Sequence, residues 1–363
     1  MQVGNPPPIL SSIISVEQSV GQRFIDLYVV HFQSLIEESH RRVEQCKNVK
    51  EGEPIPRGLN QLLGQGVWYA TDYYMALKKF KQSECLTSME NNGTFFHGLA
   101  PKDAVTSVTD PSSLSGRRLF TFRVKKGCSA TQALESLEKG LSIIDCYTVI
   151  ELAAYHALKE LMPEKFDLLF AADSPTPFCI GLEKNMSPIM RLFKRKEIAA
   201  EKDIQKGDKF HVSNIQTYIH KSPAGNARGF NLVCKTTECA KRYLGFGLNS
   251  TGVDVEDVEK ALWEDYNAKP ILEGFYSPEL WKRMFSTYIL QDEKRSREFV
   301  FANKDKQLTW EQFQQEPVRN IHRLTKKKGK LLLEVFRPSL KRIERLAQAT
   351  SANACQVLAS FGS

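Results

Sequence analysis

The stretch from Leu141 to Leu161 constrains the fold of this chain more than any other part of the sequence. A short apolar run of strand character covers 141–144. Beyond it, apolar residues recur at helical spacing, namely Ile150, Ala153, Ala157, Leu158 and Leu161. Asp145 and Cys146 stand at the junction. The sequence therefore predicts a strand that hands over directly to a helix beginning at Cys146.

Two interpretations of Cys146 follow from this position. Unpaired amide groups and the positive end of the helix dipole favour a thiolate in the first turn, as a nucleophile requires. Free cysteine is also among the most buried residue types, so an inert core cysteine at a helix start is the plainer interpretation. The rest of the sequence has to distinguish the two.

Several short motifs surround the cysteine in a definite order. Lys125-Lys-Gly127 precedes it, and four segments follow: Glu164-Lys-Phe-Asp167, Lys206-Gly-Asp-Lys-Phe-His211, Ala227-Arg-Gly-Phe-Asn-Leu-Val233 and Leu244-Gly-Phe-Gly-Leu248. In order and spacing, residues 117–253 resemble the small protein-glutamine gamma-glutamyltransferase family of spore-forming bacteria. The resemblance implies a papain-like fold in which an acidic residue, here Asp145, precedes the nucleophilic cysteine.

The chain departs from that family at two positions. The family has a catalytic glutamate after its Arg-Gly pair, and this chain has Phe230 there. The family has a histidine in a Gly-His-Gly-like turn, and this chain has Phe246. A thiol with an ordinary pKa near 8.5 is only about a few per cent ionised at neutral pH. Either another residue supplies the base or the activity has changed or been lost.

Four residues are candidates for the replacement base: Asp145, His211, His220 and Glu238. Asp145 is adjacent to the cysteine, but neighbours on a helix point about 100° apart. His211 alternates with Phe210 and Val212 in a strand pattern, which predicts that it faces the opposite side from them. Histidine titrates nearest neutrality, and papain-like enzymes take their base from a strand after the nucleophile helix. We therefore rank His211 first.

The coarse pattern predicts an α+β protein. A helical segment would occupy 1–115, a papain-like core 116–253 and a helical, basic region 254–363. The helix that starts at Cys146 should pack against an antiparallel sheet built from about 117–124, 208–219 and 228–235. Helices are also expected over 16–49, in the second half of 187–206, and over 255–266 with Asp254 as its cap.

Positive charge is concentrated near the C-terminal end. The formal net charge is +8, and between Glu316 and Arg345 ten Lys or Arg stand against three Glu. Lys326, Lys327, Lys328 and Lys330 precede an apolar run over 331–336 that reads as a strand. Such a surface suits an acidic protein or an anionic membrane. The plainer interpretation is a hairpin-like element with a solvated basic rim.

The function that the resemblance implies is acyl transfer at a protein glutamine, either transglutamination or deamidation, through a cysteine thioester on Cys146. The substrate would be a protein with an exposed glutamine, and no cofactor would be needed. A second hypothesis is an inactive scaffold of the same fold that binds a partner or membrane through its basic region. A cysteine peptidase is a third.

Other features limit the classes further. No run of eighteen apolar residues occurs, and 1–10 lacks the pattern of a classical secretory signal, although other export signals would not show this pattern. The eight cysteines are irregularly spaced, which fits a reducing, cytoplasmic compartment. Cys234 and Cys239 resemble half a zinc site but lack a matching second pair, so no metal is predicted. No nucleic-acid-binding motif occurs.

Overall fold

The computed structural model describes the following residues: 18–47, 61–63, 122–124, 126–139, 141–143, 146–180, 187–215, 217–221, 229–236, 241–268, 302, 305–316 and 333–361. Within them the protein combines helices with an antiparallel sheet, so the predicted α+β class is confirmed. The helices are α1 (Val20–Lys47), α5 (Ala130–Lys139), α6 (Cys146–Leu161), α7 (Pro163–Leu169), α8 (Tyr218–Lys221), α9 (Val255–Asn267), α12 (Trp310–Gln315), α13 (Leu340–Gln348) and α14 (Ser351–Ala359). Two short 3-10 turns, η1 (Pro188–Leu192) and η2 (Glu201–Asp203), complete the set.

The main sheet has five antiparallel strands in the order β5-β9-β6-β7-β8. Their bounds are β5 (Phe193–Ile198), β6 (Lys209–Ser213), β7 (Gly229–Thr236), β8 (Arg242–Gly245) and β9 (Leu333–Pro338). Two smaller pairs lie outside it: β1 (Gln61–Leu63) pairs in parallel with β3 (Leu141–Ile143), and β2 (Phe122–Arg123) pairs in antiparallel fashion with β4 (Cys179–Ile180). The sheet therefore joins strands that lie more than a hundred residues apart in the sequence.

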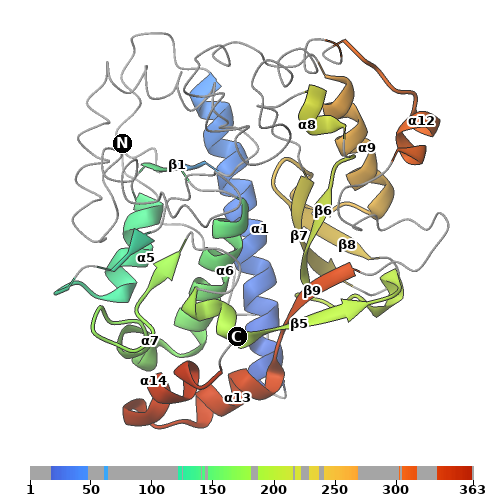
Figure 1. The fold of residues 1–363 in the computed structure, drawn as a ribbon. Coiled ribbons are helices and arrows are strands. Elements are labelled where there is room, and N and C mark those ends of the chain that lie inside the picture. The colour runs from blue at the N-terminus through green and yellow to red at the C-terminus, as the bar shows by residue number, and fades with distance from the viewer. Residues whose placement is uncertain are drawn as a thin grey trace.

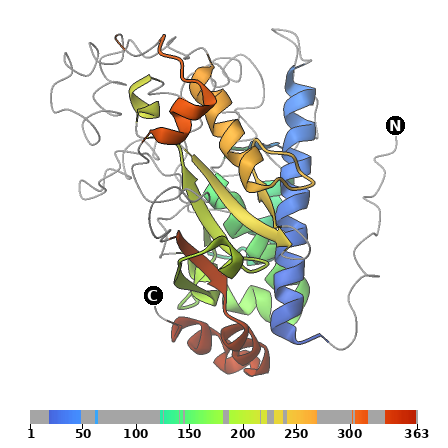
Figure 2. The same cartoon turned by 90° about the vertical axis from the view of Figure 1, so that its right-hand side faces the viewer.

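A separate hydrophobic cluster covers each face of the main sheet. On one face, α1, α6, α7, α13 and α14 contribute most of the buried side chains. On the other face, α9 and α12 pack over the strands. Figure 1 shows the sheet between α1 and α6 on one side and α9 and α12 on the other, and Figure 2 shows α13 and α14 together at one end. The molecule is thus a three-layer arrangement with the sheet in the middle.

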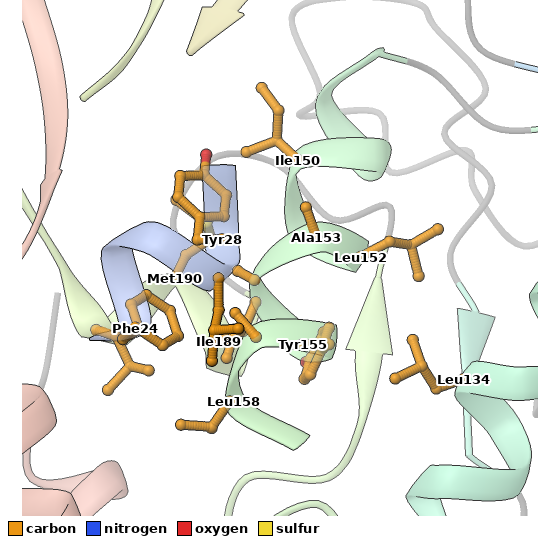
Figure 3. Packing of buried hydrophobic residues seen from close by; sticks show 14 of the residues in the cluster. Phe24, Tyr28, Leu134, Ile150, Leu152, Ala153, Tyr155, Leu158, Ile189 and Met190 are labelled. Atoms are coloured by element: carbon orange, nitrogen blue, oxygen red, sulfur yellow. The ribbon is translucent and has the colours of Figure 1, made fainter. Parts of the chain in front are cut away.

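The first cluster is centred on α1 and α6. Figure 3 shows Phe24 and Tyr28 of α1 packed toward Ala153 and Leu158 of α6. All four side chains have no exposed surface. Small buried residues on α6 let the two helices pack closely, and this packing holds α6 in place.

Several expectations about elements are confirmed. The strand over 141–143 hands over to a helix that begins at Cys146, and α1 lies within the predicted helix over 16–49. Asp254 caps α9 in a capping box with Asp257. Strand β9 lies two residues later than the predicted run over 331–336.

Three expectations are wrong. The segment predicted as basic then helical, 187–206, instead contains the strand β5 between two 3-10 turns, because its ladder with β9 outweighs local helix propensity. Residues 122–123 pair with β4 and do not join the sheet of β6 and β7. The helical spacing of Phe24, Leu27, Val30, Leu35 and Ile36 predicts that Val30 lies on the apolar face of α1, but Val30 is 38% exposed.

Candidate functional site

The start of α6 lies on the side of the sheet that faces the first hydrophobic cluster. Cys146 is the first residue of α6, and the structure describes its backbone alone. Asp145 lies outside the described residues. The described side chains nearest to Cys146 on α6 include Tyr147 and, one turn later, the fully buried Glu151.

Lys209 connects β6 to the first turn of α6. Its side chain is 2% exposed, and its Nζ lies 3.5 Å from the centre of the Tyr147 ring. The same Nζ lies 4.9 Å from the centre of the Phe336 ring on β9. A cation held over aromatic faces is attracted by their negative quadrupoles, and the attraction is larger in a desolvated site. The start of β6 is therefore in contact with the residue that follows Cys146.

His211 lies on the same face of the sheet as Lys209. Phe210 and Val212 belong to the second cluster, so the alternation of β6 turns Lys209 and His211 toward α1 and α6. This confirms the predicted orientation of His211. The residue is half-buried.

Asn231 contacts the His211 ring from the neighbouring strand. The two residues are directly opposite in the β6–β7 register, and the Nδ1 of His211 lies 3.3 Å from the Oδ1 of Asn231. An amide oxygen at this distance accepts a hydrogen bond from Nδ1–H, which leaves Nε2 as the basic nitrogen. Asn231 was not predicted as a site residue. Only the pairing of β6 with β7 brings Asn231 to His211, and the sequence does not specify that pairing.

Gly229 provides the space for the His211 ring. A Cβ at this position would lie 2.6 Å from the Nε2 of His211 and 2.3 Å from the carbonyl oxygen of Val212. Both distances are shorter than van der Waals contact, so a larger residue would move the ring or the strand. The glycine of the Arg228-Gly229 pair is therefore explained by the Val212 carbonyl and the His211 ring, which both lie against it.

The two aromatic departures from the resemblance both pack against a hydrophobic cluster. Phe230 packs against the second cluster, on the opposite face of β7 from Asn231. Phe246 is 4% exposed, and its ring packs edge-on against Phe32 of α1 at a centroid distance of 6.1 Å. Neither position contributes a polar group to the site.

A buried ion pair holds the start of β6 in place. Arg337 of β9 donates two hydrogen bonds of 2.7 Å to the carboxylate of Asp208, which is fully buried. Burial raises the pKa of Asp208, and the hydrogen bonds from Arg337 and from the Gln205 amide partly offset that rise. Gly207 precedes this pair with φ of +81°, and its Cα hydrogen faces Ile25 of α1.

The side chains of the remaining predicted site residues are not among those that the structure describes. His220 belongs to α8, whose backbone alone is described at that residue. Glu238 and the basic residues Lys326, Lys327, Lys328 and Lys330 lie outside the described residues. Burial raises the pKa of the Cys234 thiol to about 12 and raises the pKa of Cys355 as well. Both thiols are therefore poor nucleophiles at neutral pH.

One buried hydroxyl lies near this end of α6. Tyr28 of α1 is fully buried, and its hydroxyl has no hydrogen-bond partner among the residues that the structure describes. Burial raises its pKa. Figure 3 shows the hydroxyl at the end of α6 that carries Ile150, away from Leu158.

Within the described part of the chain, no group of three or more His, Cys, Asp or Glu could hold a metal ion. No described helix is both long enough and apolar enough to cross a membrane. No family model, curated protein or solved structure matches this chain.

Proposed function

We propose that this protein catalyses acyl transfer at protein glutamine side chains through a thioester on Cys146. The observation that carries the proposal is the contact of His211 with Asn231 on the sheet face turned toward α6, the helix that begins at Cys146. A cysteine at a helix start, a histidine on a strand and an amide that orients the histidine make up the papain-like site. We infer a papain-like core on the same ground.

In this reaction His211 accepts the thiol proton, and the sulfur of Cys146 attacks the carbonyl carbon of the glutamine side chain. The carbon–nitrogen bond breaks, the histidine returns the proton to the leaving nitrogen, and ammonia departs from an acyl thioester. A lysine amine then forms an isopeptide bond, or water forms glutamate, and the thiol is regenerated. The backbone amide of Cys146 is the natural donor to the oxyanion.

Asn231 takes over the orienting role that an acidic partner would have. In the resembled family the catalytic glutamate stands at the position of Phe230, which here packs into the second cluster. The next residue along β7 points to the other face and contacts His211. The proposed substrate is a protein with an exposed glutamine, in a reducing cytoplasmic compartment that keeps the thiol reduced.

Incubation with a glutamine-containing protein and a primary amine probe tests the reaction. We expect amine incorporation, or a gain of about one dalton per deamidated glutamine, by mass spectrometry. Cys146→Ala should abolish both products, because a thioester cannot form without the sulfur. Cys128→Ala, which removes a partly exposed cysteine near the start of α5, is the matched control and should keep full activity. Equal activity in wild type and Cys146→Ala would refute the proposal.

A second candidate function is a binding scaffold without catalysis. The observation that favours it is the core packing of Phe230 and Phe246, which removes both polar groups that the resemblance leads one to expect. The partner would be an acidic protein or an anionic membrane surface bound by Lys326, Lys327, Lys328 and Lys330. Changing these four lysines to Glu should abolish binding to anionic vesicles, while Cys146→Ala should leave it unchanged. Binding that survives the four changes would exclude this surface.

A further inference from the structure

Strand β5 is an edge of the main sheet and presents a run of charged side chains. In the described part of the chain its one strand neighbour is β9, and Figure 1 shows it at the rim of the sheet. Residues 194–197, which read Lys-Arg-Lys-Glu, are all exposed, whereas Phe193 and Ile198 at the two ends are buried. The strand is therefore anchored at both ends and open along its middle.

Hydrogen bonds at Phe193 show which backbone groups of β5 point away from β9. The amide of Phe193 donates to the carbonyl oxygen of Met190, and its own carbonyl oxygen accepts from Arg342 at 2.9 Å. Alternate residues of an antiparallel strand direct their N–H and C=O groups to opposite sides. The backbone groups of Arg195 and Glu197 therefore point away from β9, as those of Phe193 do.

The intervening residues of β5 bond to β9. Just before the strand, the carbonyl oxygen of Leu192 accepts a hydrogen bond of 2.8 Å from the amide of Ser339, which follows β9. Residues 194, 196 and 198 continue this alternation along the ladder. An added strand can therefore meet the outward N–H and C=O groups of Arg195 and Glu197 without disturbing the pairing of β5 with β9.

The pleat of β5 sorts its charged side chains onto two faces. Arg195 is opposite Phe336, and its guanidinium lies 2.6 Å from the carboxylate of Glu334. Lys194 and Lys196 lie on the other face, about 7 Å apart along the strand. Among the residues that the structure describes, neither lysine forms an ion pair with a carboxylate. This face of the edge therefore carries two unmatched positive charges at alternate positions.

We propose that the open edge of β5 binds an extended, acidic segment of another protein as an additional strand of the sheet. The backbone groups of Arg195 and Glu197 hydrogen-bond to this segment, and its acidic side chains at alternate positions lie beside Lys194 and Lys196. Because β5 is already ordered by β9, binding costs backbone entropy mainly in the partner. This inference is independent of the proposed reaction, since β9 separates β5 from the strand that carries the candidate base.

The same charges disfavour a second copy of this chain at the edge. Lysines on exposed edge strands hinder the pairing of like strands. Pairing of β5 with the β5 of a second copy brings the lysines of both chains onto one face, where like charges in cross-strand positions are destabilising. An acidic strand replaces this repulsion with attraction, so the edge selects its partner by charge.

Fluorescence anisotropy with the full chain and a labelled peptide of alternating Glu and Thr tests the proposal. We expect saturable binding of this peptide and none of a peptide of alternating Lys and Thr. Lys194→Glu combined with Lys196→Glu should weaken binding by about tenfold or more, because two attractive cross-strand pairs become repulsive. The matched control combines Lys126→Glu with Lys341→Glu, two exposed lysines outside the sheet, and should bind nearly as wild type does. No binding of the acidic peptide, or equal loss in the two double variants, overturns the proposal.

A proline in the edge strand tests the backbone pairing. Glu197→Pro removes the outward N–H and keeps the ladder with β9, because proline is tolerated on an edge strand where its nitrogen faces solvent. It should bind the acidic peptide about tenfold more weakly than Glu197→Ala, which keeps the amide. Equal affinities in these two variants, both shown to be folded by circular dichroism, overturn the strand pairing.

A modified peptide gives the same comparison on the wild-type protein, even where Glu197→Pro does not fold. The acidic peptide N-methylated at every residue keeps its charge but has no amide donors, and it should not bind. Binding equal to that of the unmethylated peptide overturns the proposal. Self-association in sedimentation velocity that Lys194→Glu with Lys196→Glu abolishes would show a second copy at this edge and overturn it as well. None of these measurements uses an acyl substrate, so a failure of acyl transfer leaves their outcome unchanged.

Discussion

At the scale of single residues, the candidate site is built from two adjacent strands. Lys209 and His211 lie on β6, and Gly229 and Asn231 lie on β7. Gly229 leaves room for the His211 ring, and Asn231 contacts the Nδ1 of that ring. Lys209, two positions before His211 on β6, contacts the Tyr147 ring on α6. Each of these contacts joins residues from two different elements, which lie apart in the sequence. The chemistry of the site is therefore a product of strand pairing.

The first prediction concerns the base and the residue that orients it. His211→Ala should slow iodoacetamide labelling of Cys146 at pH 7 by about tenfold or more, because general-base catalysis contributes at least that much. Asn231→Ala should slow it less, because the imidazole remains but loses the acceptor for its Nδ1–H. Circular dichroism checks that both variants fold.

The control for this prediction is Asp145→Ala. If only that change slows labelling, while His211→Ala labels at the wild-type rate, then His211 is the wrong base and the residue adjacent to the cysteine carries the role. Asn231→Ala without any effect would contradict the orienting contact alone.

At the scale of elements, β9 ties the C-terminal part of the chain into the sheet. It lies between β5 and β6, and its Arg337 reaches across to the start of β6 through Asp208. α13 follows directly and packs against α1. The elements that present Lys209 and His211 are thus held by a strand more than one hundred residues further along the chain.

The second prediction tests this ion pair. Arg337→Met leaves a fully buried carboxylate without its partner, and the free energy of unfolding should fall by about 2–4 kcal/mol, with the partial exposure of the arginine favouring the lower end. The double variant with Asp208→Asn should lose less than the sum of the two single changes. Urea denaturation measures all three.

The pH dependence of the same variant follows from the sign of the shift. Burial already raises the pKa of Asp208, and loss of Arg337 raises it further. A carboxyl with a raised folded-state pKa favours the protonated folded protein, so the deficit is smallest in acid and grows as the pH rises through that pKa. A deficit that instead grows toward acid would contradict this account of Asp208.

At the scale of the whole molecule, the two hydrophobic clusters share one sheet. Elements from the N-terminal, central and C-terminal parts of the chain supply the first cluster, and the second contains residues of β6, β7, β8, β9 and α9. Because the same strands cover both clusters, neither layer can keep its packing when the sheet opens.

The third prediction is a single cooperative unfolding transition within the described part of the protein. Leu358→Ala in α14 and Leu262→Ala in α9 each create a cavity, in the first and the second cluster respectively. Each should lower the free energy of unfolding by about 2–5 kcal/mol and move one common transition, seen alike by circular dichroism and by tryptophan fluorescence. Two separate transitions, of which each variant moves only one, would contradict a shared sheet.

The sequence by itself determined the elements whose signals are local. The apolar run over 141–144 and the helical spacing after Cys146 predicted β3 and α6, and the alternation around His211 predicted which face it takes. Asp254 and its capping box marked the start of α9. Each of these signals lies within a single helix or strand, so no distant contact is needed to read it.

Only the tertiary structure decided which of these elements meet. No local pattern indicates that 193–198 forms a strand, because its partner β9 lies about 140 residues away and supplies the backbone hydrogen bonds. The register of β6 and β7 places Asn231 opposite His211, and the pleat of β7 turns Phe230 toward the second cluster on the other face. Side-chain direction in a sheet has a period of two, so a shift of one residue in the pairing would exchange the two. Local propensity does not set that pairing; the burial of apolar side chains on both faces of the sheet does.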